Sequence, residues 1–207
     1  MHIPDLLHAQ VCIAKQNGSG EALRVIKPWP VISAERLADY RVFSVRRVVR
    51  RSPRTGGEHD FFVLDAPDWV NVIAITTDGQ MVMVEQFRHG TESVDLEIPG
   101  GVTDPQDASP IEAGVRELRE ETGYAGENAR LIGSVRPNPA ILSNTCHTVL
   151  VENCRRCCNI ELDHAEDVAT RLIPARQVAA LVADGTIRHS LVVAAIYDYE
   201  LSLRGCR

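Results

Sequence analysis

The chain of 207 residues is 44% hydrophobic and 24% charged, and its formal net charge is −6. This length and composition suit a globular protein with one well-filled core and an added subdomain, whereas the negative charge argues against general attraction to nucleic acid or to an anionic membrane. Because no apolar run is long enough to span a bilayer and no export signal is visible at the N-terminus, we expect a cytoplasmic protein without a membrane or nucleic-acid partner.

The first 66 residues show two different patterns. Residues 1–28 carry no strong pattern, and Gln16 to Gly20 (QNGSG) indicates a turn or flexible stretch, so we expect partial order there. Residues 29–66 contain three strand-like pieces, at 30–33, 40–51 and 60–65. Three short antiparallel strands are marginal alone, so this small β subdomain needs a surface to pack on, either the main domain or another subunit.

Residues 67–207 have the pattern of a larger α/β domain. A hairpin is predicted at 70–77 and 80–87, because Asp78-Gly79 between them favours a tight two-residue turn. Further strands are predicted at 93–98, 129–135, 145–152 and 168–173, and helices at 175–184 and 190–203. Strands on both sides of one central helix, with helices at the end of the chain, predict an α/β/α sandwich.

The central helix is predicted at residues 110–122. Ser109 to Glu112 reads S-P-I-E, a capping box with proline at the first helical position, and Gly123 is a C-terminal stop. Before the helix, residues 100–107 form a loop that contains glycine and proline, whose backbone can approach a ligand closely.

Three carboxylates gather near one side of this helix, at Glu117, Glu120 and Glu121. Like charges three and four residues apart on a helix repel one another, and a divalent cation would remove this penalty. Carboxylates opposite a loop whose carbonyls can point inward make an all-oxygen site, which suits Mg²⁺ or Mn²⁺. The alternative is a solvated acidic face balanced by Arg116 and Arg119.

The same stretch resembles the Nudix box, G-x5-E-x7-R-E-U-x-E-E-x-G-U, in which U is apolar. The matching residues are Gly101, Arg116, Glu117, Leu118, Glu120, Glu121, Gly123 and Tyr124. The flanking segments DWVNVIAI, EQFRHG, LEIPGG and NPAILSN are similar to the ADP-ribose pyrophosphatase branch of that family. The resemblance implies a Nudix-type sandwich with a mixed sheet.

The resemblance also implies a metal-dependent hydrolase that cleaves the diphosphate of a nucleoside diphosphate linked to another group. ADP-ribose, hydrolysed to AMP and ribose 5-phosphate, is the first expectation. Two alternatives stay open: hydrolysis of another nucleotide sugar such as GDP-mannose, and nucleotide sensing by a catalytically silent Nudix-like protein. A sensor would be expected to lose the metal-binding glutamates, and all three are present here.

One departure from the box lies between Gly101 and Arg116, where the chain has one residue more than the pattern and lacks the first glutamate. Counting forward puts Asp107 in its place, and counting back from Arg116 puts Ala108 there. Because the extra residue precedes the capping box, the helix keeps its register. We expect an active enzyme in which Asp107 partly substitutes for the glutamate.

The family resemblance assigns roles within and around the box. It implies Glu117 and Glu121 as the principal metal ligands, with Glu120 and the backbone carbonyl of Gly100 completing the set. Arg116 would anchor these carboxylates by charge-assisted hydrogen bonds.

Outside the box, the resemblance implies that Arg88 contacts the substrate diphosphate. Glu97 either contacts substrate or supports the loop after it. Asn144 ends the segment 138–144, which we expect to form one wall of the site. Trp29 resembles an adenine-stacking aromatic residue, although a single tryptophan is as often a packing residue.

The general base is expected in the acidic loop at 159–167, because in ADP-ribose hydrolases it tends to come from a mobile loop after the box. Our choice is Glu166, which lies just before the next strand, and Glu161 is the second candidate. A solvated run of charge is the other interpretation of this loop.

Pyrophosphatases of this type are generally dimers that share N-terminal strands, so the resemblance also implies a homodimer through residues 29–66. A basic zone in this region could attract an anionic substrate, meet a second subunit or lie on a solvated strand. Its members are Arg41, Arg46, Arg47, Arg50, Arg51 and Arg54.

Six cysteines occur, at Cys12, Cys146, Cys154, Cys157, Cys158 and Cys206. The C-x-x-C-C cluster at 154–158 lacks a second C-x-x-C or a histidine pair, so we expect reduced thiols here and no zinc site.

Overall fold

The computed structural model describes residues 25–205, and the flexible stretch expected at 16–20 lies outside them, as do Cys12 and Cys206. The strands are β1 (Val31–Asp39), β2 (Ser44–Arg51), β3 (Glu58–Asp65), β4 (Trp69–Thr76), β5 (Gln80–Arg88), β6 (Ser93–Glu97), β7 (Gly100–Val102), β8 (Tyr124–Val135), β9 (Cys146–Arg156) and β10 (Val168–Pro174). The helices are α1 (Pro110–Thr122), α2 (Ala175–Ala183) and α3 (Ser190–Leu203).

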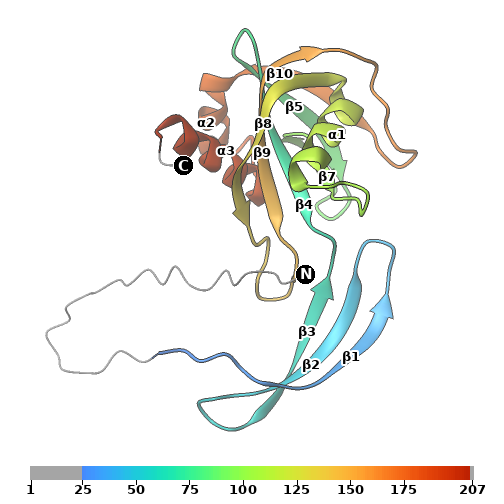
Figure 1. The fold of residues 1–207 in the computed structure, drawn as a ribbon, viewed down its shortest axis with the longest axis vertical. Coiled ribbons are helices and arrows are strands. Elements are labelled where there is room, and N and C mark those ends of the chain that lie inside the picture. Colours follow the sequence, from blue (N-terminus) through green and yellow to red (C-terminus); the bar gives the residue numbers. More distant parts are fainter. Residues whose placement is uncertain (1–24, 206–207) are drawn as a thin grey trace, which may run out of the picture.

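The larger sheet has seven strands in the order β10-β5-β4-β9-β8, with β6 beside β5 and β7 beside β4. It is mixed, because β4 runs parallel to β9 while the other pairs are antiparallel. Helix α1 covers one face of this sheet, and α2 and α3 cover the other (Figure 1). The predicted α/β/α sandwich with a mixed sheet is therefore confirmed.

Strand β4 shows why the sheet is covered on both faces. Val70, Val72 and Ala74 pack with α1, whereas Ile73 packs with α3 on the opposite face. Alternate residues of a strand point to opposite faces, so a nearly continuous apolar run requires a layer on each side.

The hairpin of β4 and β5 opens into a gap that receives the loop preceding α1. The two strands pair at Ile75 and Met81, next to the predicted turn. Farther from the turn, residues 69–71 of β4 pair with β7 and residues 84–88 of β5 pair with β6. Part of the loop expected at 100–107 is thus a short strand, because its backbone completes the hydrogen bonds that the diverging strands leave open.

The three strands β1, β2 and β3 form a separate antiparallel sheet below the larger one in Figure 1. It meets the main body through backbone hydrogen bonds from the Leu64 amide to the Ile141 carbonyl, 2.8 Å, and from the Ser143 amide to the Leu64 carbonyl, 3.2 Å. Strand β2 begins at Ser44 rather than at residue 40, because the Tyr40 amide bonds to the Phe43 carbonyl in a turn, 2.9 Å.

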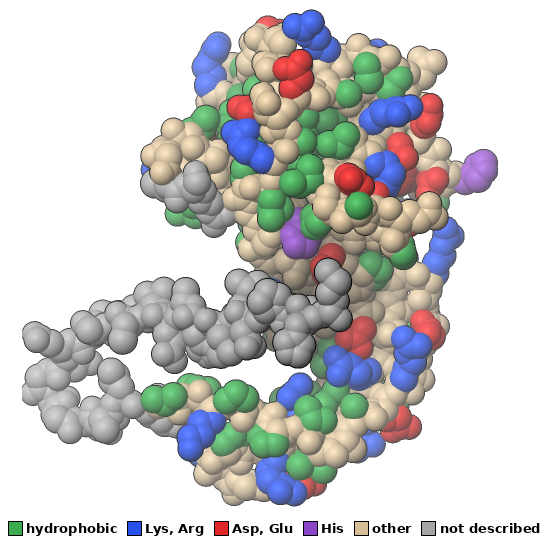
Figure 2. Space-filling model, viewed as in Figure 1, with side chains coloured by type: hydrophobic (Ala, Val, Ile, Leu, Met, Phe, Trp, Pro, Cys, Tyr) green, Lys and Arg blue, Asp and Glu red, His purple; other side chains and the backbone are tan. Residues whose placement is uncertain are grey.

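Several arginines of the predicted basic zone pair with acidic residues across this small sheet: Arg46 with Asp65, Arg47 with Asp60, and Arg51 with Glu58. Large apolar side chains are exposed on the same sheet and mix with the charged ones in Figure 2. They include Val31, Ile32, Leu37, Phe61 and Phe62. Among residues 25–205, no helix has the length and apolar character needed to cross a membrane.

Candidate functional site

Helix α1 begins and ends where its sequence signals predict. The Ser109 hydroxyl accepts a hydrogen bond from the Glu112 amide, 3.2 Å, with Pro110 at the first position. At the other end, the Gly123 amide bonds to the Arg119 carbonyl, 2.8 Å, and Gly123 has φ of 72°. A Cβ at this position would lie 2.5 Å from the Cys158 carbonyl oxygen, so only glycine lets the chain turn back here.

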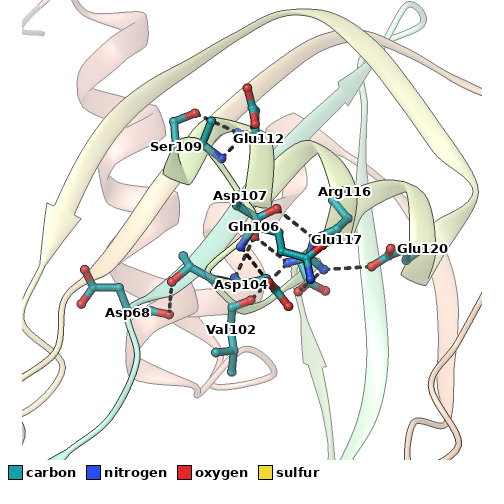
Figure 3. A network of polar contacts seen from close by, with 12 residues as sticks. Asp68, Val102, Asp104, Gln106, Asp107, Ser109, Glu112, Arg116, Glu117 and Glu120 are labelled. Atoms are coloured by element: carbon teal, nitrogen blue, oxygen red, sulfur yellow. Dashed lines mark hydrogen bonds and ion pairs between the residues drawn. The ribbon is translucent and has the colours of Figure 1, made fainter.

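Arg116 is the centre of a polar network at the start of the site (Figure 3). Its Nε and Nη2 donate to the two carboxylate oxygens of Asp107, at 3.1 and 3.0 Å. Its Nη1 donates to both Glu117 and Glu120, each at 2.9 Å. The bidentate contact lowers the pKa of Asp107 and raises that of Arg116. The structure therefore places the Asp107 carboxylate, rather than residue 108, against the arginine of the box.

Two of the glutamates are buried. Glu117 is 8% exposed, and its carboxylate packs against Gly101, where a Cβ would lie 2.5 Å from it. Glu121 is 4% exposed and accepts a hydrogen bond from the Gly100 amide, 3.0 Å. Burial raises the pKa of both groups, that of Glu121 to about 8. Gly100 contacts Glu121 through its amide. That the Gly100 carbonyl binds a metal stays a prediction.

These carboxylates fit a hard divalent cation. They are oxygen donors in a place where burial penalises their negative charge, and a cation would restore the balance. Within residues 25–205, no three acidic, histidine or cysteine side chains already converge as a ligand set. Without a cation, the positive charge beside Glu117 and Glu120 comes from the Arg116 guanidinium, which forms ion pairs with both.

The acidic loop after β9 faces the same carboxylates. A cleft of about 500 Å³ is lined by Glu117, Glu120 and Arg116 from α1 and by Glu161 and Glu166 from the loop. The Glu161 amide bonds to the Glu120 carbonyl, 2.8 Å, which holds the loop against the helix. The negative charge of Glu166 contributes to the raised pKa values of Glu117 and Glu121. The structure therefore brings Glu166 together with the glutamates of the box.

Arg88 and Glu97 form an ion pair in which Glu97 is buried and Arg88 is partly exposed. Arg88 Nε and Nη2 donate to the two oxygens of Glu97 at 2.7 and 2.6 Å, and Glu97 is only 2% exposed. The contact raises the pKa of Arg88, to which the negative charge of Glu121 also contributes. Glu97 supports Arg88 in this arrangement, while Arg88 lines two cavities.

Asn71 and His189 are two polar residues of this region that the sequence analysis missed. They line a cavity of about 260 Å³ together with Arg88, Gly100 and Gly101. Asn71 Nδ2 and His189 Nδ1 are buried without a hydrogen-bond partner, and His189 Nδ1 lies 3.6 Å from the Glu97 carboxylate. A polar side chain between buried Val70 and Val72 is the signal that could have pointed to Asn71.

Two of the expected binding residues, Asn144 and Trp29, do not line the acidic cleft. Asn144 is 3% exposed, and its Nδ2 donates to the Pro67 carbonyl, 3.0 Å, which ties the segment before β9 to the start of β4. The Trp29 ring packs on His59 and Phe61 of the small sheet, with each pair of ring centroids 5.7 Å apart.

Comparisons with known proteins agree with this geometry. The model of the NUDIX domain matches residues 67–190. An ADP-ribose pyrophosphatase of Mycobacterium tuberculosis is 28% identical over 166 residues, which are 80% of each chain. An ADP-ribose pyrophosphatase of Bacillus subtilis is 33% identical over 90 residues, 44% of this chain and 48% of that protein, so the match spans about half of that relative.

Among solved structures, the crystal structure of an ADP compounds hydrolase superimposes with a TM-score of 0.77 at 22% identity. It covers 88% of this chain and 97% of that chain, which is a likeness of fold. The matched NUDIX domain takes up more than half of the sequence and contains the capped helix, the buried glutamates and the acidic loop. The chain therefore belongs to the Nudix family.

Proposed function

We propose that the protein is a divalent-metal-dependent hydrolase of nucleoside diphosphates linked to another group, and that its substrate is ADP-ribose, cleaved to AMP and ribose 5-phosphate. The observation that carries this proposal is the acidic cleft lined by Glu117, Glu120 and Glu166. The buried Glu121 is close enough for the charge of Glu166 to help raise its pKa. The names of the M. tuberculosis and B. subtilis relatives support the choice of substrate.

In this proposal Glu117, Glu120 and Glu121 would hold Mg²⁺ or Mn²⁺, and the cation would supply positive charge to the diphosphate and acidify the attacking water. Arg116 orients Glu117 and Glu120 through its Nη1. Asp107 in turn holds Arg116 through two separate N–H groups, so the arginine keeps its position when those glutamates bind a cation.

Arg88 and Glu166 act on the substrate from neighbouring cavities. Arg88, fixed by both oxygens of Glu97, offers its remaining N–H groups to the diphosphate. Glu166 accepts the proton of the attacking water, and its carboxylate is positioned by the Asp163 amide at 3.0 Å.

We also propose that the small sheet of β1, β2 and β3 is a contact with a second copy of the chain. Its exposed apolar residues, such as Ile32 and Phe62, would be covered there. Trp29 lies on this sheet, so a dimer would allow it to reach the adenine in the partner's cleft. Light scattering that shows a monomer at micromolar concentration would remove this part of the proposal.

A panel of nucleotide sugars with Mg²⁺, Mn²⁺ or EDTA tests the function. Metal-dependent release of AMP from ADP-ribose, faster than release of GMP from GDP-mannose, is the expected result. Faster hydrolysis of GDP-mannose would make the second candidate substrate correct. Tight binding of ADP-ribose without turnover under any metal would instead identify a sensor and overturn the hydrolase proposal.

A further inference from the structure

The cysteine cluster separates into two different environments. The Cys154 thiol is 1% exposed, packs in the core under α1, and faces the Val151 carbonyl at 3.4 Å. Cys157 and Cys158 follow the end of β9, where Cys157 is exposed and Cys158 is partly exposed. Only this adjacent pair of described thiols is open to a reagent in water.

The two accessible thiols both point toward the backbone carbonyl of Gly123. Their Sγ atoms lie 3.6 Å apart, and they face the Gly123 carbonyl at 3.5 and 3.8 Å. The guanidinium of Arg119 lies beside the Cys158 thiol. Two sulfur atoms this close together can both bond to one thiophilic atom.

We propose that Cys157 and Cys158 form a chelating site for trivalent arsenic compounds. Zinc in a protein takes four ligands, and within residues 25–205 no third histidine, cysteine or carboxylate converges on this pair. Trivalent arsenic is satisfied by two thiolates and one substituent of its own. The reaction of an organoarsenic oxide, R–As=O, with both thiols forms two As–S bonds and releases one water, and arsenic stays trivalent throughout.

This site is connected to the acidic cleft through the backbone. The amides of Cys157 and Cys158 donate to the Gly123 carbonyl at 2.8 and 3.3 Å, immediately after α1. Three residues beyond Cys158, the Glu161 amide bonds to the Glu120 carbonyl. Because an arsenic bridge restrains the start of the loop that carries Glu166, occupancy should slow turnover. This coupling rests on the proposed hydrolase function, whereas the binding does not.

Binding is tested on the full-length, reduced protein with phenylarsine oxide as the probe, in a background that carries C12S and C206S. Intact mass should show one phenylarsenic group per chain that survives a challenge with excess glutathione and is removed by a small dithiol. The C157S and C158S variants, whose circular dichroism and melting temperature confirm folding, should lose the label to glutathione, because one thiolate cannot chelate. Equal retention by the C157S/C158S variant would overturn the proposal, as would loss of the label from the parent.

Coupling is tested on the same samples by initial rates with ADP-ribose and Mg²⁺. The parent should lose at least about tenfold in kcat when labelled, which is less than the loss expected from removing the general base, because Glu166 is displaced and not replaced. The C157S/C158S variant should keep its rate in the presence of the probe. A labelled parent with an unchanged rate would refute the coupling and leave the binding site standing. A parent protein that takes up the label but has no activity before labelling would refute the hydrolase proposal alone.

Discussion

Replacing Glu121 by glutamine removes a buried negative charge while keeping the side-chain shape and an acceptor for the Gly100 amide. Burial is the largest cause that raises the pKa of Glu121 to about 8 from an ordinary value of 4.5. Because the folded-state pKa lies above the unfolded one, folding favours the protonated acid. The ionisation of buried Glu121 therefore lowers the free energy of unfolding of the wild type as pH rises from 4.5 to about 8. Above that range this energetic penalty is complete.

The size of the penalty follows from the shift. Each pKa unit corresponds to about 1.4 kcal/mol, so the interval from 4.5 to about 8 limits the penalty to about 5 kcal/mol. Glutamine does not titrate, so metal-free E121Q should be more stable than the wild type above pH 8. For a chain of this length the difference corresponds to a melting temperature on the order of 10 °C higher. Near pH 4.5 the two proteins should be equal within about 1 kcal/mol.

The assay is thermal unfolding in EDTA and in MgCl₂, followed across this pH range. A cation that binds the folded state at a hundredfold excess over its Kd adds about 2.7 kcal/mol, so Mg²⁺ should stabilise the wild type strongly and E121Q weakly. The matched control is E127Q, which changes an exposed glutamate on β8. The reasoning is refuted if E121Q is less stable than the wild type in EDTA above pH 8, or if Mg²⁺ stabilises both proteins equally.

Three further substitutions test the site by steady-state kinetics with ADP-ribose. D107A frees two N–H groups of Arg116 and should lower kcat/KM on the order of tenfold, and an unchanged rate and metal dependence would show that Asp107 does not replace the missing glutamate. E166Q should lower kcat about a hundredfold, the scale of a general base, and a near-normal rate would move that role to Glu161 or back into the box. R88K cannot reproduce the two-point contact with Glu97, so KM should rise on the order of tenfold, and an unchanged KM would exclude a diphosphate contact.

The sequence by itself determined helix α1 and the acidic face it presents. The capping box at Ser109 and the stop at Gly123 each act on the few residues next to them, and the placement of Glu117, Glu120 and Glu121 near one side follows from the helical period alone. The apolar patterns likewise determined the layers of the sandwich. A strand with alternating apolar residues is buried on one face, and a strand with a continuous apolar run is buried on both.

The tertiary structure decided every relation between residues far apart in the chain. Whether Asp107 or residue 108 meets Arg116 depends on how the loop folds back on α1, and counting in either direction left both open. The cavity with Asn71 and His189 exists because β4 and β5 diverge and admit β7, a geometry that no local pattern encodes. Local signals specify where an element starts and stops, whereas a site built from several elements also requires their packing.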